Sequence, residues 1–165
     1  ALDDEKKKPS MEVSFHAWIL KTFPSINCVC HTHPTNTIKI LCSSRLHDFA
    51  NKRLFPDQVV RNGTKSCVVP YATPGLPLRE AIKTSVEEFI GRNGFFPKLI
   101  LLSNHGIITT GASVRECTVS TLMCEKSAEI FIGAKLLNNI QFLTPQEIAA
   151  VDTNPNEKYR RELYQ

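Results

Sequence analysis

The stretch CVCHTHPTN, residues 28–36, places two histidines two positions apart, after an apolar run and before a proline. Side chains two residues apart on a β-strand point to the same face, so His31 and His33 would lie side by side, about 7 Å apart at the backbone. Their ring nitrogens could then converge on one cation, with bonds of about 2.0–2.1 Å to zinc. Pro34 favours an extended residue before it, which fits a strand. The alternative is that both histidines face solvent at a strand end and bind nothing.

A third histidine, His105, lies in the stretch LLSNHGII, where two apolar runs flank the residues from Asn104 to Gly106. This pattern predicts a β-hairpin, and the glycine allows a tight turn. A histidine has no obvious role in such a turn. Three imidazoles with one open coordination position are typical of catalytic zinc. The sequence therefore predicts a metal site formed by His31, His33 and His105.

Glu12 is the candidate acid/base of this site. It lies in the first turn of a predicted helix, where the helix dipole stabilises a carboxylate, so its location also has a purely structural explanation. The helix directly precedes the strand with the histidine pair and could bring Glu12 to the metal. A carboxylate beside a Lewis-acid metal can move a proton at carbon while the metal stabilises the resulting enediolate. His16 and His47 are expected to be structural or exposed.

The composition is that of an ordinary globular protein. The 165 residues suffice for one domain with a hydrophobic core. The net charge is only +4, and no basic helix with interleaved aromatic residues argues for nucleic-acid binding. No apolar run is long enough to span a membrane, and the N-terminus does not resemble a signal peptide. The six cysteines form no C-x-x-C pair and lie in apolar contexts, which is typical of reduced thiols in a cytoplasmic protein.

Helices and strands are predicted to alternate along the chain. In chain order they are a helix capped by Ser10 and ended by Pro24, a strand over 26–33, a helix over about 35–51, a strand–turn–strand over 55–71, a helix ended by Gly94, the hairpin around His105, a helix from Ser113 to about Asn138 and a last helix from Thr144. The local hairpin favours a mixed or antiparallel sheet covered by helices. We expect residues 1–9 to be flexible, residues 10–151 to form the domain and residues 152–165 to be a C-terminal tail.

The combination of Glu12, His31, His33 and His105 resembles the class II aldolase/adducin family. This family includes L-fuculose-1-phosphate and L-rhamnulose-1-phosphate aldolases, ribulose-5-phosphate 4-epimerases and methylthioribulose-1-phosphate dehydratase. The stretches that carry the resemblance occur in the family's order and span nearly all of residues 9–151; they are PSMEVSFH, CVCHTHPTNTI, FPDQVVRNG, VPYATPG, LLSNHGIITTG and EKSAEI.

The resemblance implies an α/β fold, namely a three-layer α/β/α sandwich around a mostly antiparallel sheet. It implies zinc, or another divalent transition metal, bound by the three histidines, with Glu12 as acid/base and Ser10 as a contact of the substrate phosphate. The implied activity is cleavage or formation of a carbon–carbon bond in a ketose 1-phosphate through a metal-stabilised enediolate. The implied assembly is a homotetramer, and no nucleic-acid or membrane partner is expected.

The sequence departs from the family pattern in three places. Members of the family carry an upstream G-N-x-S element that holds the substrate phosphate, and nothing like it precedes Pro9, so we expect this segment to be lacking. Met11 replaces the family's second phosphate-binding serine. The position of a second acid carries Lys52 or Ala50, with Asp48 as the nearby candidate. Two alternatives to an aldolase therefore stay open: a 4-epimerase or dehydratase on the same metal site, and a non-catalytic adducin-like interaction module.

Overall fold

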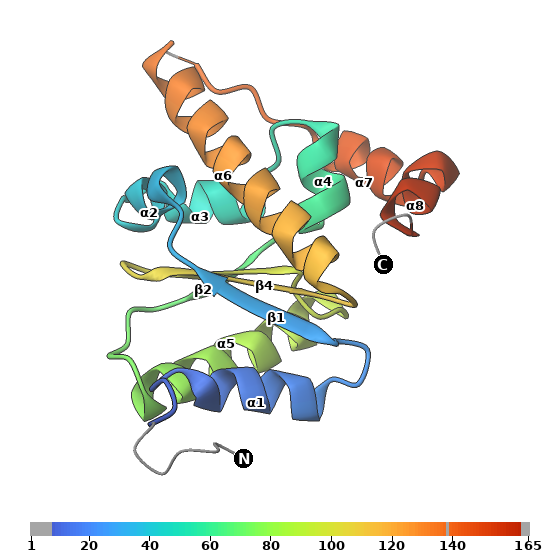
Figure 1. Ribbon diagram of the computed structural model, residues 1–165. Coiled ribbons are helices and arrows are strands. Elements are labelled where there is room, and N and C mark those ends of the chain that lie inside the picture. Colours follow the sequence, from blue (N-terminus) through green and yellow to red (C-terminus); the bar gives the residue numbers. More distant parts are fainter. Residues whose placement is uncertain (1–7, 138, 163–165) are drawn as a thin grey trace.

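The computed structural model describes residues 8–137 and 139–162, and its sheet lies between two groups of helices (Figure 1). Helices α1 (Val13–Thr22) and α5 (Leu76–Asn93) cover one face of the sheet. The helices on the other side are α2 (Thr35–Leu41), α3 (Leu46–Asn51), α4 (Pro56–Asn62) and α6 (Val114–Leu136), and α7 (Pro145–Thr153) and α8 (Pro155–Glu162) pack against α4. The predicted three-layer α/β/α architecture is confirmed.

Four strands form the sheet in the order β1-β4-β3-β2. They are β1 (Cys28–Thr32), β2 (Cys67–Val69), β3 (Leu99–Leu102) and β4 (Gly106–Gly111). Strand β4 pairs antiparallel with both β1 and β3, whereas β2 pairs parallel with β3. The sheet is therefore mixed, and the expectation of a mostly antiparallel sheet is corrected at β2. The reason is α5, which connects β2 to β3 and supplies the long crossover that a parallel pair requires.

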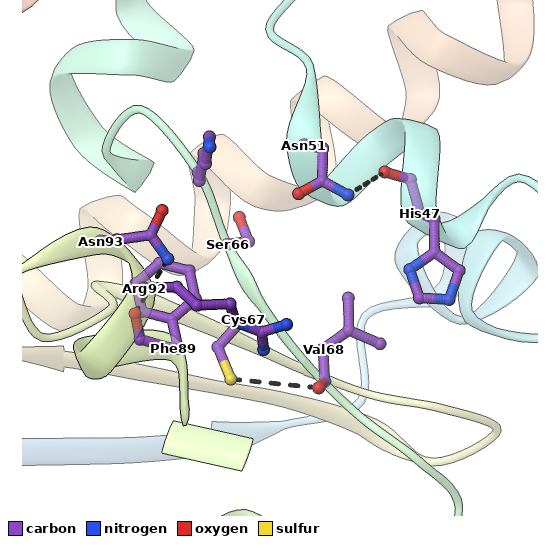
Figure 2. Close-up of a pocket in the computed structure, with 9 residues that line it drawn as sticks. His47, Asn51, Ser66, Cys67, Val68, Phe89, Arg92 and Asn93 are labelled. Atoms are coloured by element: carbon purple, nitrogen blue, oxygen red, sulfur yellow. Dashed lines mark hydrogen bonds between the residues drawn. The ribbon is translucent and has the colours of Figure 1, made fainter. Parts of the chain in front are cut away.

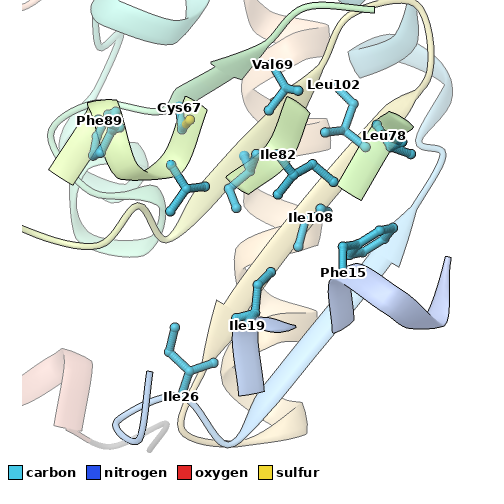
Figure 3. Close-up of a cluster of buried hydrophobic side chains, with 12 residues drawn as sticks. Phe15, Ile19, Ile26, Cys67, Val69, Leu78, Ile82, Phe89, Leu102 and Ile108 are labelled. Atoms are coloured by element: carbon cyan, nitrogen blue, oxygen red, sulfur yellow. The ribbon is translucent and has the colours of Figure 1, made fainter. Parts of the chain in front are cut away.

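Two hydrophobic clusters hold the layers together, one on each face of the sheet. The side chains of β3 alternate between them: Ile100 and Leu102 face α1 and α5, while Leu99 and Leu101 face α2, α3 and α6. Figure 3 shows the first cluster, in which Phe15 and Ile19 of α1 pack towards the sheet. This packing fixes α1 against the sheet, and with it Glu12, the N-cap residue of that helix.

The stretch FPDQVV is a helix and not the expected strand. Pro56 stands at the start of α4 and Asp57 in its first turn, and both are helix-start signals. Val59 and Val60, which suggested a strand, are buried against the rest of the protein. Burial of this helical face therefore outweighs the β-propensity of the two valines.

Other element boundaries also differ from the sequence prediction. The expected helix over 35–51 is broken into α2 and α3, and α1 begins at Val13, after the expected cap Ser10. The hairpin, the end of α5 at Gly94 and the N-caps Ser113 of α6 and Thr144 of α7 are confirmed.

The ends of the expected domain are not tested by the structure. Residues 1–7 of the segment predicted to be flexible lie outside the described residues, as do Asn138 and residues 163–165. Helix α8 lies within the stretch 152–165 that was expected to be a tail. The domain limits 10–151 stay a prediction. Among the described residues, no helix has both the length and the apolar character that crossing a bilayer requires.

Arg53 is a fully buried cation that joins three parts of the fold. Its guanidinium donates to Gly63 O (2.7 Å), to Lys52 O (2.9 Å) and to Ser66 Oγ (3.1 Å). It also donates to Ala50 O at 3.1 Å, at the end of α3. Burial lowers the pKa of Arg53 to about 10, which leaves it charged at neutral pH. Arg53 thus connects α3, the end of α4 and the entry to β2.

We predict that Arg53→Met lowers the free energy of unfolding by about 3 kcal/mol, because it leaves several buried acceptors without a donor. The matched control is Arg45→Met, which removes only a surface ion pair with Asp48 and should cost less than about 1 kcal/mol. Urea denaturation of both variants measures the difference. A loss below about 0.5 kcal/mol for Arg53→Met would contradict the prediction.

Candidate metal centre

The structure brings the three predicted histidines together. His31 is on β1, His33 follows the end of that strand, and His105 is in the turn between β3 and β4. The register of β1 on β4 places His31 opposite Ile108 and Thr32 opposite Ile107, so the end of β1 lies beside the turn that carries His105. One ligand atom from each histidine lies within 4.8 Å of the others.

The spacing of these nitrogens fits a shared metal ion. His33 Nε2 lies 3.1 Å from His31 Nε2. Two nitrogens that each lie 2.0–2.1 Å from one tetrahedral ion are about 3.3 Å apart, close to this separation. The ring centroids of His31 and His105 are 5.0 Å apart, and those of His33 and His105 are 5.1 Å apart. The three rings therefore surround one small volume.

Glu12 extends this cluster to four groups. Its Oε2 atom lies 3.3 Å from His31 Nε2, and its Oε1 atom lies 3.2 Å from His105 Nε2. Glu12 is the N-cap residue of α1, whose packing on the sheet points the start of the helix at the histidines. The carboxylate therefore lies where a fourth ligand of the same ion, or an acid/base beside it, would be.

A backbone hydrogen bond sets the tautomer of His31. Its Nδ1 atom lies 2.8 Å from Ile107 O, and a carbonyl oxygen can only accept, so Nδ1 carries the proton. In the neutral ring, Nε2 then presents a lone pair to the oxygen of Glu12. His31 Nε2 and Glu12 Oε2 are 3.3 Å apart, and their facing lone pairs repel each other unless a cation or a proton lies between the two atoms. This arrangement is typical of a metal-binding histidine held by a second hydrogen bond.

Gly106 permits the close approach of the β1 end to the hairpin turn. A Cβ atom at this position would overlap His33 Cδ2 and would lie 2.7 Å from Thr32 O. The sequence indicated only that Gly106 lets the chain turn, because its contact with His33 links residues that are far apart in the chain. Only the absence of a side chain at Gly106 leaves room for the His33 ring.

Comparison with known proteins now places the chain in a family. Residues 1–132 match the class II aldolase and adducin N-terminal domain. The chain belongs to this family. The predicted resemblance is thereby confirmed, and it covers the segments that carry Glu12 and the three histidines.

Individual relatives of the family are named as enzymes. The chain is 30% identical to a 3-oxo-tetronate 4-phosphate decarboxylase of Haemophilus influenzae, over 86% of this chain and 63% of that protein. It is 27% identical to an L-fuculose phosphate aldolase of Methanococcus maripaludis, over 82% of this chain and 66% of that protein. The crystal structure of YgbL from Escherichia coli superposes with a TM-score of 0.72 at 26% identity and covers 89% of this chain and 67% of the other. The chain spans 62–63% of the length of the relatives named 3-oxo-tetronate 4-phosphate decarboxylase.

Burial keeps two of the clustered histidines neutral in this member of the family. Desolvation lowers the pKa of His31 below 6.5, although the hydrogen bond to Ile107 and the charge of Glu12 act in the opposite direction. Desolvation also lowers the pKa of His105, with a further contribution from His31. Neutral imidazoles are the form that binds metals. Within the described part of the chain, His105 Nδ1 has no hydrogen-bond partner, whereas His105 Nε2 lies 3.2 Å from Glu12 Oε1.

The remaining candidates lie outside the cluster. His16 stacks on Phe15, with ring centroids 4.5 Å apart, which agrees with its expected structural role. Asp48 forms ion pairs with Lys52 (2.8 Å) and Arg45 (2.9 Å). The hydrogen bond from Lys52 is the main cause of its lowered pKa, and this is the opposite of what a general acid near neutral pH needs.

A cavity of about 320 Å³ lies at the free edge of β2, away from the histidine cluster (Figure 2). His47, at its rim, is exposed as expected. The cavity is lined by His47, Asn51, Lys65, Ser66, Cys67, Val68, Phe89, Arg92 and Asn93. None of these residues belongs to the cluster of Glu12 and the three histidines.

The free energy of unfolding of the metal-free protein should fall as the pH drops below about 7. Because the pKa values of His31 and His105 are lowered, the unfolded chain binds protons near pH 6.5, where the folded chain does not yet bind them. Stability is therefore lost from about pH 7 down to the folded-state pKa values. Denaturation with a chelator present, between about pH 8 and pH 5, measures this loss. His105→Asn should make the dependence shallower; an equal slope in this variant would contradict the explanation.

Gly106→Ala should displace the His33 ring, because the added Cβ overlaps it. We expect about 2 kcal/mol of lost stability and at least about tenfold weaker zinc binding. The control is Gly133→Ala on α6, where a Cβ meets nothing within 4 Å and should stabilise the helix slightly. Denaturation and zinc titration test both variants. Zinc binding of Gly106→Ala equal to that of the unchanged protein would refute the steric argument.

Proposed function

We propose that this chain supplies the metal ligands and the acid/base of a zinc-dependent lyase that breaks or forms a carbon–carbon bond in a sugar phosphate. The observation that carries the proposal is the convergence of three imidazole nitrogens within 4.8 Å, with the Glu12 oxygens at 3.2 and 3.3 Å from two of them. Its membership in the class II aldolase and adducin family supports the same conclusion.

The proposed ligands of the ion are His31, His33 and His105. Three neutral nitrogens and a carboxylate suit zinc, and they also suit manganese, cobalt or iron. A divalent ion held there supplies positive charge beside the oxygens of a bound ketose and stabilises the negative charge that develops on them. The protein's part is to hold the rings in place through the Ile107 carbonyl and the close contact at Gly106.

Glu12 is proposed to move the proton. Its side chain is 21% exposed, so a substrate beside the histidines can reach it. When a carbon–carbon bond next to a carbonyl group breaks, the electron pair remains on the sugar-phosphate fragment, and that carbon must then gain a proton. Glu12 in its acid form donates this proton, and its carboxylate removes it in the reverse reaction.

Ser10 is proposed to contact the phosphate of the substrate. It is exposed, and its Oγ atom accepts a hydrogen bond from Glu12 N at 3.2 Å. The hydroxyl proton of Ser10 remains available as a donor to a phosphate oxygen. The proposed phosphate contact is thus two residues from the proposed acid/base.

Two reactions fit this centre. Aldol cleavage of a ketose 1-phosphate agrees with the relatives named L-fuculose phosphate aldolase, and decarboxylation of a 3-oxo acid agrees with those named 3-oxo-tetronate 4-phosphate decarboxylase. Both leave an electron pair beside a carbonyl group and need the same later protonation. An epimerase or dehydratase would use the same groups. Retention of all the predicted ligands argues against a non-catalytic interaction module.

Assembly and location complete the proposal. We propose a homotetramer in the cytoplasm. Helix α6 exposes Val114, Leu122 and Leu136, and such apolar side chains are suited to contacts between subunits. All six cysteines are free thiols, which fits a reducing compartment. Light scattering after size-exclusion chromatography would give the mass of four chains if the assembly is correct.

The decisive experiment joins metal analysis with two substrate assays. The purified protein is loaded with zinc and given ketose 1-phosphates, with aldehyde release as the signal, or 3-oxo-tetronate 4-phosphate, with carbon dioxide release as the signal. We expect about one zinc ion per chain, lost in His33→Ala, and turnover of one substrate class. Absence of bound zinc after loading would refute the proposal.

Glu12→Gln should separate metal binding from proton transfer. The amide keeps the shape of the side chain but cannot supply the proton, so we expect turnover to fall by a factor of about 10² or more. Because the three histidines remain, zinc should still be bound. Turnover of this variant within about threefold of the unchanged protein would exclude Glu12 as the acid/base.

A further inference from the structure

A carboxylate of α6 binds the first turn of α2, just after the histidine pair. Glu125 Oε1 accepts a hydrogen bond from Asn36 N at 2.8 Å. Glu125 Oε2 accepts one from Thr37 N and one from Thr37 Oγ1, each at 2.9 Å. These contacts join residues that are 88–89 positions apart in the chain. Glu125 belongs to the stretch EKSAEI, one of those that carry the family resemblance.

Helix α2 has no cap of its own. The N-cap residue is Pro34, whose side chain makes no capping hydrogen bond. The first amide groups of a helix lack partners within the helix and need an acceptor from elsewhere. A carboxylate is the acceptor that the helix dipole favours most. Glu125 therefore supplies the capping acceptor for the first amide groups of α2, which the side chain of Pro34 cannot supply.

The position of the His33 ring is less constrained by strand pairing and by hydrogen bonds than that of the His31 ring. Strand β1 ends at Thr32, so His33 lies beyond the last paired residue, and it is exposed. The ring of His31 is fixed by Ile107 O, whereas the polar contact of the His33 ring is with His31 itself. The direction in which the chain leaves His33 is thus an important determinant of where its ring lies.

Helix α6 is a firm anchor because it is bound to both strands of the site. Cys117 Sγ donates to Cys28 O on β1 at 3.4 Å. Thr109 Oγ1 of β4 donates to Cys117 O at 3.2 Å, and it lies 2.9 Å from Thr121 Oγ1. A group held by α6 is therefore held relative to β1 and β4 together.

We infer that Glu125 is a positioning residue of the metal centre: by holding the first turn of α2 against α6, it fixes the path of the chain after β1 and so fixes His33. The inference rests on the proposed function, since it takes the three histidines to be metal ligands. Glu125 acts through the backbone and touches neither the metal site nor a substrate.

The charge state of Glu125 agrees with this role. Burial alone would raise its pKa, but the hydrogen bonds from Asn36 and Thr37 outweigh burial and lower it. Glu125 is therefore an anion at neutral pH and keeps all three acceptor contacts. Thr37 donates two of these hydrogen bonds, from its backbone N and from Oγ1. It is fully buried, so no water competes for its hydroxyl group.

The test compares Glu125→Gln with Glu129→Gln in the full chain. Glu129 is one turn further along α6 and is exposed, so its variant loses the same charge without the contact to α2. Zinc affinity is measured by competition with a chromophoric chelator, and the visible spectrum of the Co²⁺-loaded protein reports the ligand geometry. Unfolding of the metal-free variants is measured separately, so that loss of stability is not mistaken for loss of positioning.

We expect Glu125→Gln to bind zinc about tenfold or more weakly and to change the cobalt spectrum, and Glu129→Gln to match the unchanged protein. Wild-type affinity and spectrum in folded Glu125→Gln would overturn the inference and leave a simple helix cap. Thr37→Val, which removes one of the three hydrogen bonds, should weaken zinc binding about two- to threefold. If Glu125→Gln does not fold, wild-type affinity in Thr37→Val overturns the inference. A parent chain that binds no zinc would refute the proposed function itself.

Discussion

The antiparallel pairing of β1 with β4 is the constraint on which the site depends. It sets Thr32 opposite Ile107, and the start of β4 therefore lies beside the end of β1. The same register brings Ile107 O to His31 Nδ1 and brings His33 against Gly106. Because side chains alternate along a strand, a shift of one residue would turn His31 away from the cluster.

The hydrophobic layers make this register stable. Ile107 and Ile108 of β4 belong to the clusters on opposite faces of the sheet, so neither can move without exposing apolar surface. Phe15 links the hydrophobic core to the histidine cluster. It packs in the cluster beneath α1, and its ring meets His31 edge-on, with centroids 5.6 Å apart. The core thus fixes helix α1, and its N-cap residue Glu12 lies beside His31 and His105.

Local signals in the sequence allowed part of the fold to be predicted. Gly94, Ser113 and Thr144 mark helix ends because their backbone or side chain satisfies the terminal groups of those helices. These local signals were misleading where burial in the core determines the secondary structure. Residues 56–62 carry two valines that favour a strand, but packing against α6 and the start signals at their N-terminal end make them helical. The parallel partner of β3 also could not be found, since pairing is a long-range choice.

The sequence by itself determined the candidate ligands. Each of their sequence signals involves residues close together in the chain and is therefore visible without the fold. These signals are two histidines two positions apart before a proline, a histidine in a hairpin turn, and Glu12 at the start of a helix. Only the tertiary structure decided what holds these residues in place. The carbonyl of Ile107 and the contact of Gly106 with His33 come from strand pairing, and Glu125 reaches α2 from 88–89 residues away. Contacts across such distances in the chain leave no local pattern, because they arise only when the packed core brings the elements together.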